Sequence, residues 1–224
     1  LNALSDLTID EDAAQQTVSL AGISAGGGES QPLKVIAASS STGLVPDPTV
    51  TYTSADATGT LKFTPVADES GTATITVTVE DGGLDGDLDT GGDNGTFSRA
   101  FVVTVNAVND NPTLNALSDL TIDEDADEQT VSLAGISAGG GESQPLRVMT
   151  TSSTTSLIPH PAVTYASAEA TGTLKFTPVA DQSGTATLTV TVEDGGLDGD
   201  LDTGGDNGTF SRTFDVMVNA INDN

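Results

Sequence analysis

The chain contains the same sequence twice. Its first thirteen residues, LNALSDLTIDEDA, occur again from Leu114, which gives an offset of 114 − 1 = 113 residues. Of the 111 positions that both copies share, 19 differ, so 111 − 19 = 92 are identical. Copies of this length have the usual size of a domain, and a fixed period near this value is typical of arrayed sandwich modules. We therefore expect a repeat at residues 1–108, a linker at 109–113 and a second repeat at 114–224, as a piece of a longer tandem array.

Each copy is rich in short segments that alternate like β-strands. The strongest is Gly71–Val79, GTATITVTV, in which apolar residues alternate with threonine, as in a strand that buries one face. Phe97–Val105 and Gly59–Val66 alternate in the same way, with Phe97 among the residues expected to face the core. Weaker strands are expected at residues 6–9, 17–23, 33–38 and 50–53. Seven strands per copy predict an all-β chain of two tandem Greek-key sandwiches of the Ig type, in an extended arrangement.

The differences between the copies agree with this register. Three differences in the last strand lie at alternate positions on its expected outer face, and one of them replaces Val102 by Asp215. The inward Ile75 becomes Leu188, which conserves volume in the way that a core tolerates.

Composition excludes several classes of function. The chain has 33 acidic and six basic residues, a net charge of −27, so it repels nucleic acids and anionic membranes. It has no cysteine, and no apolar run approaches the roughly 20 residues that span a bilayer. The sequence contains no pairing of nucleophile and base, no phosphate-binding loop and no histidine cluster, so we do not expect an enzyme.

Acidic residues are expected to gather at one end of the sandwich. Asp10-Glu11-Asp12 follows the first strand, Asp68-Glu69 precedes Gly71–Val79, and Asn109-Asp110-Asn111 forms the linker. In a sandwich, these three groups can lie at the same pole. Their oxygens suit calcium, which takes roughly six to eight oxygen ligands at flexible angles, better than they suit magnesium, which demands octahedral geometry. The alternative is that these residues simply form a solvated surface.

Four motifs resemble those of cadherin repeats. VNAVNDNP, from Val105 to Pro112, resembles the D-x-N-D-N-x-P linker of that family, and TIDEDAAQQTV resembles its early P-E-N motif. Asp68-Glu69 stands where cadherins have an L-D-R-E turn, and Val79-Glu80-Asp81 resembles their A-x-D strand end. The absence of cysteine and the abundance of Gly, Asp and Thr are more similar to the cadherin-like repeats of large bacterial surface proteins.

This resemblance implies calcium bound at the junction of consecutive repeats. We expect metal ligands at Glu11, Asp12, Asp68, Glu69, Asn109, Asp110, Asn111 and Asp194, and at the second-copy positions Glu124, Asp181 and Asp223. Two departures imply fewer ions than in animal cadherins. Ala107 replaces a linker aspartate, and the stretch Ser137–Ser143, where the family has D-x-D, contains only Glu142 as an acid.

A second candidate metal site is the loop DGGLDGDLDTGGDN, which occurs in both copies. Its spacing is not that of an EF-hand, because Thr90 and Thr96 stand where Gly and Glu are required. It is either a flexible hairpin loop or a calcium loop that relieves the repulsion between its carboxylates. The candidate ligands are Asp81, Asp85, Asp87, Asp89 and Asp93 in the first copy, and Asp194, Asp198, Asp200, Asp202 and Asp206 in the second.

Two functions remain open. The first is a structural and adhesive repeat of a large extracellular surface protein, in which calcium at the junction stiffens a rod-like spacer and the partners are neighbouring repeats. The alternative is a recognition module that binds cell-surface glycans or a like repeat. Only 4% of the residues are aromatic and none is tryptophan, which disfavours a platform for sugar stacking.

Overall fold

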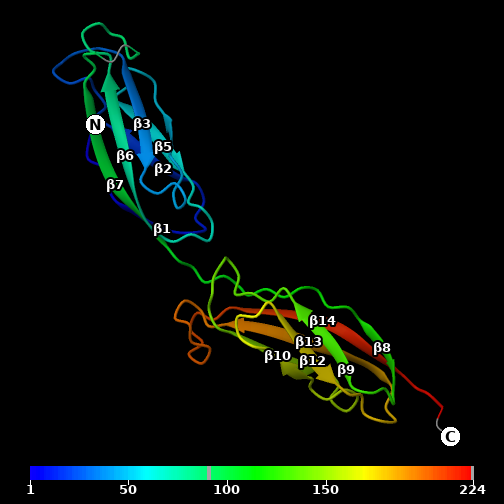
Figure 1. Ribbon diagram of the computed structural model, residues 1–224. Coiled ribbons are helices and arrows are strands. Elements are labelled where there is room, and N and C mark those ends of the chain that lie inside the picture. The colour runs from blue at the N-terminus through cyan, green and yellow to red at the C-terminus, as the bar shows by residue number, and fades with distance from the viewer. Residues whose placement is uncertain (90–91, 223–224) are drawn as a thin grey trace. The chain divides into compact units, whose positions relative to one another are not determined.

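The chain forms two compact units, Leu1–Val108 (unit 1) and Asn109–Asn224 (unit 2). Figure 1 shows both units in the computed structural model, which describes residues 1–89 and 92–222. The elements assigned within those residues are all strands, seven in each unit.

Unit 1 is a sandwich of two sheets. One sheet has the order β1-β7-β6-β3 and the other has the order β2-β5-β4. Consecutive strands β2 and β3 lie in different sheets, which is the Greek-key connection of Ig-like sandwiches. The strands are β1 (Leu7–Asp10), β2 (Gln16–Ala21), β3 (Leu33–Ser39), β4 (Thr49–Thr51), β5 (Thr58–Phe63), β6 (Gly71–Asp81) and β7 (Thr96–Asn106).

Unit 2 repeats this arrangement. Its sheets have the orders β10-β13-β14-β8 and β11-β12-β9. The strands are β8 (Leu120–Asp123), β9 (Gln129–Ala134), β10 (Leu146–Ser152), β11 (Ala162–Thr164), β12 (Thr171–Phe176), β13 (Gly184–Asp194) and β14 (Thr209–Asn219). The predicted all-β class and the two Ig-like sandwiches are confirmed.

Each core is built from alternate residues of the two longest strands. Along β6, Ala73, Ile75, Val77 and Val79 are buried, while the threonines between them face outward. The register predicted for this strand is therefore confirmed. The difference at Val102 also lies on the outer face, because this side chain is exposed.

The prediction for Phe97 was wrong. Phe97 is 48% exposed, although Phe101, Val103 and Val105 of the same strand are buried. Phe97 pairs with Val79 near one end of the sandwich. The guanidinium of Arg99 lies 4.9 Å from the centre of the ring. Strand alternation gives the side of the sheet on which a residue lies, but not whether the opposite sheet extends far enough to cover it.

The strand directions define two poles in each unit. In unit 1, β1 and β7 are parallel and both end where β6 begins, which places Asp10, Asn106 and Gly71 at one end. We call this end the C-terminal pole. At the opposite end, the N-terminal pole, the loop after Asp81 joins β6 to β7. Unit 2 has the same two poles.

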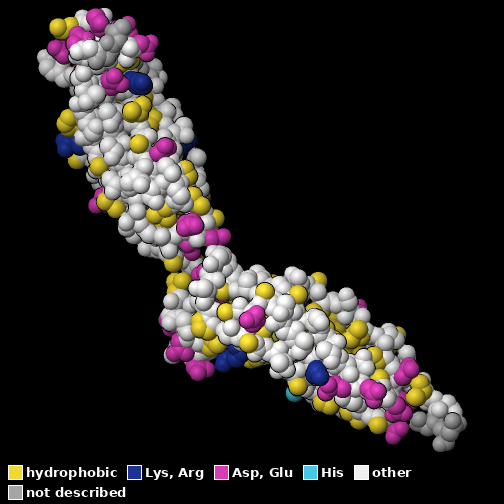
Figure 2. Space-filling model, in the orientation of Figure 1, with side chains coloured by type: hydrophobic (Ala, Val, Ile, Leu, Met, Phe, Trp, Pro, Cys, Tyr) yellow, Lys and Arg dark blue, Asp and Glu magenta, His cyan; other side chains and the backbone are white. Residues whose placement is uncertain are grey.

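The surface is strongly acidic. Figure 2 shows Asp and Glu side chains at many places on both units, and Lys and Arg at few. Within the described parts of the chain, no helix has the length and apolarity that crossing a membrane requires.

We predict that Leu61→Ala destabilises unit 1 alone. Leu61 is fully buried in β5, and truncation of such a leucine costs about 2–5 kcal/mol because it leaves a cavity. In urea, the unfolding curve should separate into two transitions, with only the transition of unit 1 moved to lower urea. The control is Lys62→Ala, at the exposed neighbouring position, which should change the stability by about 0.5 kcal/mol or less. A single unshifted transition for Leu61→Ala would contradict the assignment of the core.

Candidate metal site

The linker residues Asn109–Thr113 fold onto the N-terminal pole of unit 2. The amide of Thr113 donates to the carbonyl of Ser137 at 2.9 Å, and its hydroxyl donates to the carbonyl of Gly135 at 2.7 Å. Pro112 is buried. The linker is therefore a packed part of the second sandwich.

Side chains also hold the linker. The Nδ2 amide of Asn109 donates to Oδ1 of Asp194 at 3.1 Å, and its Oδ1 accepts from Nε2 of Gln144 at 3.0 Å. The backbone amide of Asp110 donates to Oε2 of Glu142 at 3.1 Å. Glu142 and Asp194, which are far apart in the sequence, thus both accept hydrogen bonds from the linker.

Asp194 is the most deeply buried charged residue of this pole. It ends β13 and has no exposed surface. Its Oδ1 accepts from the amides of Gly196 at 2.9 Å and Gly208 at 2.8 Å, besides Asn109. Its Oδ2 has no hydrogen-bond partner among the described residues. Because buried carboxylate oxygens are normally paired, this oxygen is a candidate metal ligand.

Further polar atoms converge beside Asp194. A Cβ atom at Gly208 would lie 2.6 Å from Oδ2 of Asp194 and 3.1 Å from both Oδ1 of Asn111 and Nδ2 of Asn109. Only glycine leaves this space open. Two more side-chain oxygens, Oδ1 of Asn207 and Oε1 of Gln144, are buried without a partner among the described residues.

These oxygen atoms are of the kind that a hard cation such as calcium binds. They include one unpaired carboxylate oxygen and several amide oxygens, which are ligands that calcium accepts. Across residues 1–89 and 92–222, however, no three His, Cys, Asp or Glu side chains form a group that could hold a metal ion. The candidate site therefore depends on the amide oxygens of Asn111, Asn207 and Gln144 as much as on Asp194.

Unit 1 contains the same aspartate in a more open setting. Oδ1 of Asp81 accepts from the amides of Gly83 and Gly95, both at 3.0 Å. The bond from Gly95, together with that from Gly83, lowers the pKa of Asp81. Asp81 is partly exposed, whereas Asp194 has no exposed surface.

Glutamates occupy the C-terminal poles. Glu11 and Glu124 are buried, with 4% and 6% exposed, and each accepts a backbone amide through Oε1. The donors are Val108 at 2.8 Å for Glu11 and Ile221 at 2.9 Å for Glu124. These bonds fix the end of each unit where the last strand leaves the sheet.

The other acids predicted at this pole are exposed. Asp68 and Asp181 have φ angles of 61° and 57°, a left-handed conformation that aspartate tolerates in turns. Asp12 and Glu69 are exposed as well. Asp68 and Glu69 come just before Gly71 in the sequence. Because Gly71 begins β6 at the C-terminal pole, these two residues lie near the pole that also contains Glu11. Asp223 lies outside the described residues.

The aspartate-rich loops are stabilised by their own backbone. In unit 1, Oδ1 of Asp85 accepts from the amide of Asp87, Oδ1 of Asp87 accepts from that of Asp89, and Oδ2 of Asp93 accepts from that of Leu84. These carboxylates are exposed, and each accepts a hydrogen bond from a different backbone amide of the loop.

The loop of unit 2 repeats these bonds. Equivalent bonds in unit 2 involve Asp198, Asp200, Asp202 and Asp206. In addition, Arg147 forms ion pairs with Glu193 at 2.7 Å and with Asp202 at 3.3 Å. Among the described residues of these loops, no three carboxylates form a group that could hold a metal ion.

Sequence reasoning missed two polar residues of this pole. Gln144 and Asn207 contribute buried oxygens but were not predicted as ligands. The signal for Asn207 was present, because it ends the aspartate-rich loop directly before Gly208, where the loop returns to Asp194. Gln144 has no comparable sequence signal, since an isolated glutamine in a polar loop is common.

One family of proteins matches the chain in part. Residues 109–213 match the family model described as the bacterial Ig domain. The match begins at Asn109, so it includes the linker and most of unit 2. A comparison with curated proteins finds no significant match.

Solved structures of tandem domains show a weak likeness. The EC1-2 domains of a human mucin-like protocadherin are 13% identical, with 98% of this chain and 97% of that chain covered and a TM-score of 0.43. The titin domains z1z2, solved in complex with telethonin, are 13% identical, with 98% and 95% covered and a TM-score of 0.36. Domains 1–6 of the surface layer protein SbsC are 19% identical, with 84% and 20% covered and a TM-score of 0.37.

At these identities and scores, the likeness carries no information about function. The strand orders of both units and the family match of residues 109–213 are the firmer observations. The chain is a tandem of Ig-like β-sandwich repeats, and its second unit matches the bacterial Ig domain family.

Proposed function

We propose that this chain is a calcium-stabilised structural repeat of an extracellular bacterial surface protein, in which it serves as a spacer. The observation that carries the proposal is the buried Oδ2 of Asp194, which has no hydrogen-bond partner among the described residues and faces the same space beside Gly208 as Oδ1 of Asn111 in the linker. The match to the bacterial Ig domain supports the structural role.

The proposed calcium ligands are Asp194, Asn111, Asn207 and Gln144. A bound calcium ion would supply the positive charge that a buried carboxylate otherwise lacks. Asp194 holds the linker through Asn109, and the amides of Gly196 and Gly208 keep its carboxylate in one orientation. Asn111 lies on the linker itself, so a metal shared by Asn111 and Asp194 would fasten the linker to the sandwich.

The linker is the point at which such binding would affect the whole chain. Val108 donates its amide to Glu11 of unit 1, and the next residue, Asn109, donates its side chain to Asp194 of unit 2. Few rotatable bonds therefore separate the last residue fixed on unit 1 from the first residue fixed on unit 2. We propose that calcium at Asp194 restricts the linker and stiffens the spacer.

The net negative charge of the chain favours the binding of a divalent cation. The chain carries a net charge of −27, so its carboxylates repel one another across the surface, and bound calcium lowers this net negative charge. Extracellular calcium modules bind with Kd of roughly 0.1–1 mM. At a calcium concentration about ten times Kd, one site stabilises the fold by about 1.4 kcal/mol.

We predict that Asp194→Asn abolishes calcium stabilisation. The native chain should melt at a higher temperature in calcium than in chelator, as measured by calorimetry. Asparagine keeps an oxygen that can accept the amides of Gly196 and Gly208 but lacks the charge, so the variant should fold and its melting should no longer depend on calcium. The control is Asp215→Val, which removes an exposed acid and installs the residue of the first repeat, Val102. If Asp194→Asn keeps the full calcium response, the proposed site is wrong.

The spacer role predicts a calcium-dependent distance distribution between the units. The chain has no cysteine, so Thr8→Cys and Thr121→Cys, two exposed and equivalent strand positions, can carry the only spin labels. Pulsed electron–electron double resonance should give a narrow distribution of distances between the two labels in calcium and a broad one in chelator. The same pair in the Asp194→Asn background should be broad in both. Equal widths for the native chain in the two conditions would exclude calcium as the stiffening agent.

A further inference from the structure

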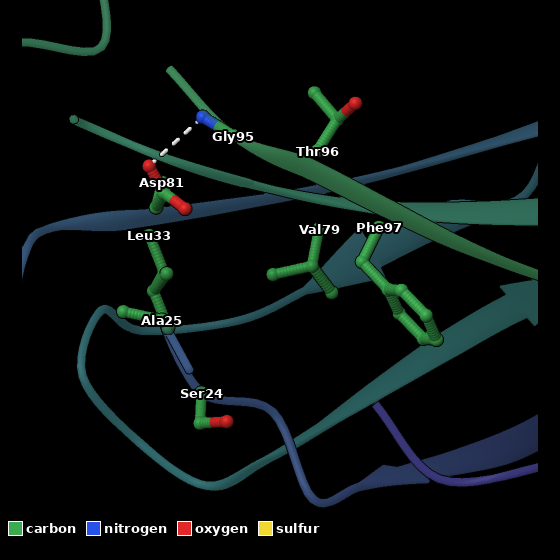
Figure 3. A pocket seen from close by; sticks show the side chains of 8 residues that line it. All are labelled: Ser24, Ala25, Leu33, Val79, Asp81, Gly95, Thr96 and Phe97. Carbon is green, nitrogen blue, oxygen red and sulfur yellow. Dashed lines mark hydrogen bonds between the residues drawn. The ribbon is translucent and has the colours of Figure 1, made fainter. Parts of the chain in front are cut away.

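A pocket opens at the N-terminal pole of unit 1 (Figure 3). Asp81 and Gly95 lie on one side of it, joined by the bond from the Gly95 amide, and Ala25 lies across from them. Val79 and the ring of Phe97 form its apolar wall. The pocket thus combines a carboxylate with an apolar surface.

Unit 2 has the same residues at the corresponding positions, and four of them, the counterparts of Ala25, Asp81, Gly95 and Phe97, are less exposed there. The eight residues that line the pocket are identical in the two repeats. Ala25 is partly exposed, but its counterpart Ala138 is 3% exposed. Phe97 is 48% exposed, whereas Phe210 is partly buried and packs against the core.

The cover in unit 2 is the linker. A Cβ atom at Gly139 would collide with the carbonyl oxygen of Asn111, and one at Gly140 would collide with the carboxylate of Asp110. At Gly26, the counterpart of Gly139 in unit 1, a Cβ atom would meet nothing within 4 Å. Identical glycines are therefore open in unit 1 and closed in unit 2, and the difference is made by residues 109–113.

We propose that the pocket of unit 1 is a docking site for an Asn-Asp-Asn-Pro-Thr segment supplied by another copy of this repeat. The repeat would then be completed by the linker that precedes it, so that each linker belongs structurally to the sandwich that follows. This inference goes beyond the proposed calcium function, because it rests on direct hydrogen bonds between protein groups of the segment and of unit 2.

The bonds in unit 2 specify what the segment would do in unit 1. Its first asparagine would donate to Asp81, as Asn109 donates to Asp194. Its threonine would donate to the carbonyl of Ser24, as Thr113 donates to that of Ser137. Glu29 and Gln31 correspond to Glu142 and Gln144 and complete the polar contacts. Burial of the apolar wall at Phe97 adds a hydrophobic contribution.

The test tethers the segment to the full chain. Residues Asn106–Thr113 are copied in front of Leu1, which gives an effective concentration of about millimolar or more. The chain has no tryptophan, so Phe97→Trp provides the only reporter. We expect its emission to shift to the blue on extension, towards the emission of a separate Phe210→Trp chain. The control extension contains the same eight residues in scrambled order and should cause no shift.

A second measurement needs no reporter. The segments Ser24–Ser30 and Ser137–Ser143 both read SAGGGES, so their amide resonances differ only through their surroundings. With the tethered segment, the resonances of Ser24–Ser30 should move towards those of Ser137–Ser143. If neither the emission nor these resonances change, the docking site is refuted. Both experiments are run in chelator, so a failure of calcium binding cannot imitate a failure of docking.

The converse variant displaces the segment where it is already bound. Gly139→Ala places a methyl group against Asn111, so the Phe210→Trp reporter should shift to the red as the linker leaves the pole. Gly26→Ala is the matched control, because Gly26 and Gly139 have similar φ angles of 91° and 99° and share the same backbone strain. Gly26→Ala, combined with the Phe97→Trp reporter of its own unit, should leave the emission of that reporter unchanged. Equal shifts in the two variants would attribute the effect to strain and overturn the role of the linker.

Discussion

The second repeat depends on the hydrogen bonds that the buried carboxylate of Asp194 accepts. Asp194 ends a central strand, accepts two backbone amides of the following loop and receives the side chain of Asn109. A buried charge is tolerated only when its surroundings supply hydrogen bonds or an opposite charge. The aspartate therefore organises the loop and the linker together, and the glycine at 208 leaves the space in which they meet.

Most of the fold could be predicted from the sequence because the repeat is built on strict alternation. Ile75 and its neighbours in β6 alternate with threonine without interruption, so both the strand and its buried face follow from the pattern. Phe97 follows the same pattern and is nevertheless half exposed. Its burial depends on what covers that end of the sandwich, and alternation within a strand contains no information about segments outside the strand.

The candidate site could be predicted only in part, for a similar reason. Asp194 and the linker asparagines were found through a short motif, whereas Gln144 and Asn207 are placed by the course of two loops. The aspartate-rich loop shows the opposite case. Its composition is consistent with either a hairpin loop or a calcium loop, and its carboxylates accept backbone amides of the same loop, a local interaction that aspartate favours in turns. Composition alone does not distinguish these two uses of the same residue.

The parallel pairing of the first and last strands has a mechanical consequence. In unit 1, Leu7 to Asp10 of β1 lie beside Val103 to Asn106 of β7, with both strands running towards the C-terminal pole. A tension that pulls the two chain ends apart draws β1 towards one pole and β7 towards the other. The hydrogen bonds between them are then strained in shear, all at the same time, rather than broken one after another. A repeat of this topology resists stretching through its terminal strands, a property suited to a module that transmits force along a chain.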